Sequence, residues 1–121
     1  MKKQRMCIKG APASAPFFKE IEVMVADTFL TRLAGLMLRQ KLPVKTGLLL
    51  VPCNSVHMFF MRFAIDVIYI DKEYKIIKVV KNLRPWIGLS MCSKAWAALE
   101  LNAGEAERCG CEVGKSIALT E

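Results

Sequence analysis

Several side chains that could take part in chemistry lie close together in the middle of the chain. His57 is the only histidine, so any imidazole chemistry depends on it. On a strand, His57 would share a face with Met61, because successive side chains point to opposite faces. Arg62 and Asp66 follow nearby. We expect His57 either to be a partly buried residue held by backbone or carboxylate groups, or to contact a ligand or act as a general base.

Two carboxylates occur in apolar strand sequences. On a strand, Asp66 would share a face with Ile68 and Ile70 while other apolar side chains occupy the opposite face, so this strand is expected to be buried on both sides. Glu100 lies between two leucines. A carboxylate in such a strand must find hydrogen bonds or a cation, or its pKa rises. One interpretation is that each acid holds a loop through backbone N–H groups. The other is one polar pocket with an aromatic ring beside it, as in many small-molecule sites. The candidate residues of that ligand site are His57, Met61, Arg62, Asp66, Trp86 and Glu100.

The cysteines do not form a recognisable metal or disulfide framework. Their number, five, is odd, and no Cys-x-x-Cys pair occurs. A closed zinc site needs about four ligands, and the spacing of Cys109 and Cys111 is unusual for zinc. On one strand, Cys53 and His57 would lie about 13 Å apart, which is too far for a nucleophile and its base. We therefore expect reduced thiols and neither a metal nor another cofactor.

The composition indicates one compact domain with a basic surface. The chain has 121 residues, 54% of them hydrophobic, and a net charge of +7. This length suits a single domain, which we place at residues 17–121, after a flexible or weakly ordered segment at residues 1–16. No segment approaches the roughly 18 apolar residues that would span a membrane. Together with the reduced thiols, this predicts a cytoplasmic monomer that does not associate with membranes.

The positive charge is spread along the chain. Lys72, Lys75, Lys78 and Lys81 are spaced by three residues, so they would alternate between the faces of a strand. The basic residues are not interleaved with aromatic side chains, as they are on platforms that stack single-stranded nucleic acid. No Gly-rich phosphate-binding loop occurs. The pattern therefore argues against nucleic acid and leaves another polyanion as an alternative partner.

Strand patterns follow one another along most of the chain. Asp27-Thr28 offers an N-cap for a helix that reaches about Arg39, and Asn102 precedes a short helix at residues 103–109. Many strands and few helices favour a mainly β (α+β) fold: a small antiparallel, barrel-like sheet with one covering helix and one short C-terminal helix. The predicted strands span residues 5–8, 21–25, 47–51, 56–61, 65–70, 75–80, 95–101 and 117–119.

Three stretches are distinctive enough to suggest a family. Residues 32–39 read RLAGLMLR, residues 53–71 read CNSVHMFFMRFAIDVIYID, and residues 98–104 read ALELNAG. In this order they resemble the family catalogued as domain of unknown function 192, although Ala64 and Asn102 stand where many members have Pro. The resemblance implies a compact, mostly β domain of bacteria and archaea, cytoplasmic or exported, and implies no established activity.

From these residues we expect a binding module that takes a small polar ligand or a protein partner. The first alternative is a hydrolase that uses His57 with Asp66 or with a cysteine, which requires a base within about 3 Å of a nucleophile. The second is a basic protein that binds a polyanion in a salt-dependent way. The sequence assigns no catalytic residue.

Overall fold

Strands make up most of the structure. The computed structural model describes residues 2–8, 21–26, 46–58 and 61–120. Within them the elements follow in the order β1 (Lys2–Ile8), β2 (Ile21–Ala26), β3 (Thr46–Leu50), β4 (Ser55–His57), β5 (Ile65–Ile70), β6 (Ile76–Leu83), β7 (Leu89–Met91), β8 (Ala97–Asn102), α2 (Glu105–Arg108) and β9 (Ile117–Thr120). No helix in this part of the chain is long and apolar enough to cross a membrane.

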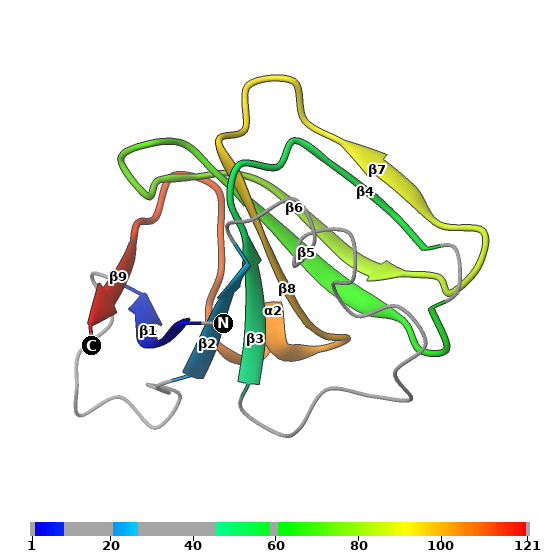
Figure 1. Ribbon diagram of the computed structural model, residues 1–121, viewed down its shortest axis with the longest axis horizontal. Helices are drawn as coiled ribbons and strands as arrows, with labels where there is room; N and C mark the ends of the chain where they lie inside the picture. Colours follow the sequence, from blue (N-terminus) through cyan, green and yellow to red (C-terminus); the bar gives the residue numbers. More distant parts are fainter. Residues whose placement is uncertain (1, 9–20, 27–45, 59–60, 121) are drawn as a thin grey trace.

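The main sheet is curled into a half-barrel (Figure 1). Its seven strands lie in the order β6-β5-β8-β3-β2-β1-β9. The two outer strands approach each other at one end, where Lys75 forms a bridge with Ser116 and Ile76 N–H donates to Lys115 O at 2.8 Å. This confirms the predicted mainly β, barrel-like fold. One difference is that β2 and β3 are parallel, which requires a crossover connection between them.

The central strands are buried on both faces and separate two hydrophobic clusters. Every residue of β5 is buried, Asp66 included, as predicted from the apolar side chains on both faces of this strand. The Leu99 face of the sheet carries Leu99, Ile68, Ile70 and further residues of one cluster, and α2 packs there through Ala106. The Tyr69 face carries Tyr69, Val67, Ala98, Leu48 and the rest of the other cluster.

A small second sheet covers the Tyr69 face. It consists of β4 and β7, which pair antiparallel and lie side by side at the right of Figure 1. Val56 and Met58, at and just after β4, are buried in the same cluster as Tyr69. The segment between β6 and β7 closes against this layer, since Trp86 N–H donates to Met58 O at 2.8 Å and Met58 N–H to Gly88 O at 2.9 Å.

Most strand predictions agree with the structure to within a few residues. β4 ends at His57, whereas the prediction continued to residue 61, and β6 continues to Leu83. β7 was not predicted, because its pattern is inverted: Ser90 is buried while Leu89 and Met91 are exposed. β1 starts at Lys2, inside the segment expected to be weakly ordered. The helix predicted from Asp27-Thr28 to Arg39 lies outside the described residues.

Candidate functional site

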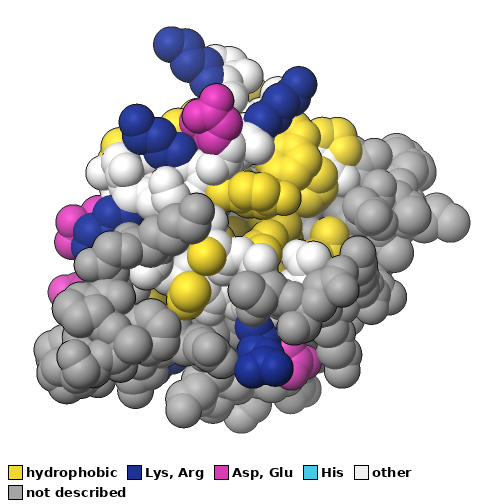
Figure 2. All heavy atoms as spheres, turned by 90° about the vertical axis from the view of Figure 1, so that its left-hand side faces the viewer, with side chains coloured by type: hydrophobic (Ala, Val, Ile, Leu, Met, Phe, Trp, Pro, Cys, Tyr) yellow, Lys and Arg dark blue, Asp and Glu magenta, His cyan; other side chains and the backbone are white. Residues whose placement is uncertain are grey.

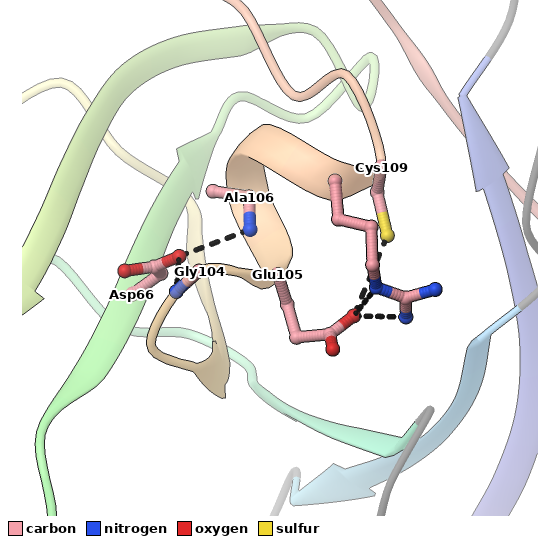
Figure 3. A network of polar contacts seen from close by, with 6 residues as sticks. Asp66, Gly104, Glu105, Ala106 and Cys109 are labelled. Carbon is pink, nitrogen blue, oxygen red and sulfur yellow. Dashed lines mark hydrogen bonds and ion pairs between the residues drawn. The ribbon is translucent and has the colours of Figure 1, made fainter. Parts of the chain in front are cut away.

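Asp66 is buried on the Leu99 face and bonds to backbone N–H groups from two distant segments. Its Oδ1 accepts a hydrogen bond from Asn82 N–H at 2.9 Å. Its Oδ2 accepts hydrogen bonds from Gly104 N–H at 2.9 Å and Ala106 N–H at 3.0 Å, as Figure 3 shows for the start of α2. The carboxylate thus joins β5 to the end of β6 and to α2. For Asp66, the structure has the loop-holding arrangement that one of the two interpretations predicted.

The same turn of helix contains an ion pair at the edge of this network. Arg108 and Glu105 form an ion pair within α2, and Cys109 Sγ lies 3.8 Å from the same carboxylate (Figure 3). The side-chain hydrogen bond from Arg108 to Glu105 raises the pKa of the guanidinium. These contacts lie within α2 and its C-cap residue, and Cys109 itself belongs to the cluster on the Leu99 face.

Glu100 lies on the other face of the sheet. It lies in the middle part of β8, opposite Leu48 of β3 and Val67 of β5, and both of these neighbours belong to the Tyr69 face. Its side chain is only 6% exposed. Burial raises the pKa of this carboxyl from 4.5 to about 8, so the neutral acid predominates at pH 7. Within the described part of the chain, no hydrogen bond to this carboxyl is present.

Tyr69 adds a second polar group to this face. It lies on β5 opposite Ala98, two residues from Glu100 along β8. Its hydroxyl donates to Ser90 Oγ at 3.1 Å and so links β5 to β7 across the layer. Burial raises the pKa of Tyr69, the hydrogen bond with Ser90 lowers it, and the nearby Cys53, Cys92 and Glu100 raise it electrostatically. Glu100 and Tyr69 therefore make a polar strip within an apolar cluster.

The structure divides the six candidate residues between different parts of the molecule. Met61 is buried, 3% exposed, in the same cluster as Tyr69 and thus on the face of Glu100. Trp86 is 50% exposed in the turn before β7, and the backbone of His57 pairs with β7. Arg62 is exposed at the surface. Asp66 lies on the opposite face, so the structure does not bring the two acids into one pocket.

A groove between β6 and β7 contains residues that the sequence did not single out as a site. It has a volume of about 550 Å³ and is lined by Asp71, Ile77, Lys78, Met91, Cys92, Ser93 and Lys94. A second hollow of about 440 Å³ shares Asp71 and Lys94 with it and reaches Trp96. Asp71 Oδ1 is already engaged, since it accepts from the N–H groups of Glu73 and Lys75. The alternation of side chains along a single strand could not reveal this groove, because the groove depends on how the two sheets lie against each other.

Charges of both signs are mixed on the side of the molecule nearest β1 and β9. Figure 2 shows hydrophobic side chains around a hollow there, with Lys or Arg and acidic side chains side by side above it. A surface that attracts polyanions strongly carries one sign of charge over a wide area. The described part of this face lacks that feature.

The thiols give no sign of a metal centre. All five cysteines are free, and among the described residues no group of three or more His, Cys, Asp or Glu side chains could hold a metal ion. Cys111 is buried, and burial first of all raises the pKa of its thiol to about 12. A thiol with so high a pKa is a poor nucleophile and a poor ligand at neutral pH.

Comparison with known proteins identifies the family. The model of the family DUF192, described as "Uncharacterized ACR, COG1430", matches residues 12–119. The chain belongs to this family. A UPF0127 protein of Thermococcus sibiricus is 34% identical over 103 residues, which are 78% of this chain and 64% of that protein. A UPF0127 protein of Pyrococcus horikoshii is 36% identical over 74 residues, 55% of this chain and 60% of that protein. The chain thus matches less than two thirds of the length of these DUF192 relatives.

Two crystal structures share the fold of this DUF192 chain. A protein of unknown function from Novosphingobium aromaticivorans superimposes with a TM-score of 0.80 at 21% identity, over 94% of this chain and 83% of the other. A candidate transcription regulator from Sinorhizobium meliloti superimposes with a TM-score of 0.84 at 22% identity, over 98% of this chain and 94% of the other. At this level of identity the two structures support the fold alone.

Proposed function

We propose that this DUF192 domain is a binding module for a small polar ligand, and that Glu100 is the group that recognises the ligand. The observation that carries the proposal is a carboxyl group buried at 6% exposure, with a pKa raised to about 8 and no hydrogen bond to the described residues. Taking a carboxyl largely out of water costs stability. Among the described residues no side-chain N or O is fully buried without a hydrogen-bond partner, so the Glu100 oxygens can still be reached from solvent. Stability given up at one residue is a common feature of binding and catalytic sites.

The chemistry of Glu100 favours an uncharged ligand. A protonated carboxyl offers one O–H donor and a carbonyl acceptor side by side, and a buried acid kept neutral can act as a hydrogen-bond donor. This arrangement matches a group with an adjacent donor and acceptor, such as a primary amide or a pair of sugar hydroxyls. Met61 and the apolar neighbours of Tyr69 supply the hydrophobic wall that small-molecule sites have around few polar groups.

A thermal-shift screen of the full chain tests the proposal. The panel contains neutral sugars, primary amides, carboxylates and amines, and it is repeated with Glu100→Leu and with Glu112→Gln. Glu112 is exposed and serves as the matched acid away from the Tyr69 face. We expect a neutral sugar or amide to raise the Tm of the wild type and of the Glu112 variant but not of Glu100→Leu. A panel without any stabilising compound, or equal shifts in all three proteins, contradicts the proposal.

The enzymatic alternative is less favourable. Asp66 accepts three backbone hydrogen bonds on the Leu99 face, so its oxygens are occupied by groups that hold the fold rather than directed at a nucleophile. A hydrolase built on Asp66 is therefore not favoured. We also propose that the protein works as a monomer in the cytoplasm. The five free thiols support a reducing compartment.

A further inference from the structure

Large exposed hydrophobic side chains are concentrated in one short segment. Of the five in the described part of the chain, four lie between residues 86 and 91: Trp86 at 50%, Ile87 at 76%, Leu89 at 74% and Met91 at 66% exposure. Single exposed apolar residues are normal, whereas a contiguous patch marks an interaction surface. The fifth, Val113, lies in the turn before β9 and provides an internal comparison.

The strand in this segment has an open edge. Cys92 N–H bonds to Asn54 O and Met58 N–H bonds to Gly88 O, on either side of β7. By alternation, the backbone N–H and C=O of Ser90 between them also point to β4. In an antiparallel pair the intervening residues direct their N–H and C=O groups away from the partner strand. These are Leu89 and Met91. Lys78 Nζ donates to Met91 O at 2.8 Å, while Leu89 N–H, Leu89 O and Met91 N–H have no hydrogen bond within the described residues.

The surroundings of this edge are basic. The chain from Lys75 to Lys94 contains five Lys or Arg residues, and it contains neither Asp nor Glu. Lys78 and Lys94 line the groove of about 550 Å³ next to β7, together with the apolar Ile77 and Met91. The one acid of that groove, Asp71, is occupied by two backbone N–H groups. An occupant of the groove therefore meets two ammonium groups against one carboxylate and two apolar side chains, beside a strand edge on which only Met91 O is occupied.

We infer that an extended, acidic peptide segment of a partner protein binds along β7 and adds a strand to it. Main-chain bonds to Leu89 N–H, Leu89 O and Met91 N–H supply the pairing. Apolar side chains of the segment contact Met91 and Ile77, and acidic ones lie near Lys78 and Lys94. A lipid surface fits less well, since open N–H and C=O groups are costly in hydrocarbon. A second copy of the chain would bring like charges together. This site is separate from Glu100.

Selection from a displayed library of random peptides tests the inference. The full chain is immobilised at low salt and presented with peptides of about twelve residues, long enough to pass both ends of β7. We expect enriched sequences in which Asp or Glu alternates with Val, Ile or Leu. One synthesised peptide should bind the Leu89→Ser/Met91→Ser variant at least about ten-fold more weakly than the wild type, and should shift the amide resonances of Leu89 and Met91.

Controls separate this surface from the alternatives. Val113→Ser removes an equally exposed apolar side chain elsewhere and should leave peptide affinity unchanged. Lys94→Glu should weaken binding of the acidic peptide. No enrichment, enrichment of neutral or basic sequences, or equal affinity for the double variant overturns the inference. The inference is also overturned if no peptide binds and the protein instead binds phosphatidylglycerol vesicles, or forms a dimer in sedimentation, and the double variant loses that binding or that dimer.

Discussion

The replacement of Glu100 by Gln should make the protein more stable, and increasingly so as the pH rises. Gln has nearly the shape of the protonated acid but cannot ionise. In the folded protein the pKa of Glu100 is about 8, against 4.5 for the solvated carboxyl in the unfolded chain. Below 4.5 both states are protonated and the wild type keeps its full stability. Between 4.5 and about 8 the unfolded state ionises and the folded state does not, so wild-type stability falls with pH.

The size of this effect follows from the two pKa values. Each unit of difference corresponds to 1.36 kcal/mol, so the interval from 4.5 to about 8 amounts to about 5 kcal/mol at high pH and roughly 3 kcal/mol at pH 7. Local relaxation and water entry reduce this figure, which makes it an upper bound. Other ionisable groups are common to both proteins and cancel in the difference between them.

Urea denaturation of the wild type and Glu100→Gln between pH 5 and pH 9 measures that difference. We expect the variant to gain stability over the wild type with each pH unit up to about 8 and to show a constant advantage above it. Glu112→Gln, which changes an exposed acid, should stay within about 0.5 kcal/mol of the wild type throughout. Parallel pH profiles for the wild type and Glu100→Gln would refute the assignment of Glu100 as a buried, neutral acid.

Three further substitutions or measurements test the framework around these sites. Asp66→Ala removes the acceptor of three backbone hydrogen bonds and should cost roughly 3–5 kcal/mol in urea denaturation; a loss below about 1 kcal/mol would contradict the role of this acid. Gly88→Ala places a Cβ 2.5 Å from a backbone oxygen and 2.7 Å from Met58 Cγ, so we expect roughly 1–3 kcal/mol of destabilisation, and an unchanged Tm would contradict it. The thiol of Cys111, buried with a pKa of about 12, should react with a thiol reagent at pH 8 far more slowly than that of the half-buried Cys53; equal rates in a mass-spectrometric time course would contradict the packing around α2.

Sequence patterns were sufficient to predict the strands whose apolar and polar side chains alternate regularly. Alternation placed Asp66 with Ile68 and Ile70, and the structure has all three on the Leu99 face. The same reasoning missed β7, where Ser90 is buried and its apolar neighbours are exposed. The burial of Ser90 depends on the hydroxyl of Tyr69 from another sheet. A partner so far away in the chain leaves no periodic signal near β7.

The different environments of Asp66 and Glu100 come from backbone geometry rather than from residue type. Glu100 has regular ladders on both sides, with β3 and with β5, and the N–H groups of a regular ladder are already paired with carbonyls. Asp66 faces irregular backbone instead: β6 has a bulge opposite it, and Asn82 and Gly104 adopt positive φ values of 56° and 93°. Such conformations release N–H groups from the ladder, and these groups bond to Asp66. An acid in a buried strand therefore becomes a structural anchor where neighbouring chain segments depart from regular pairing, and is left without backbone donors where they do not.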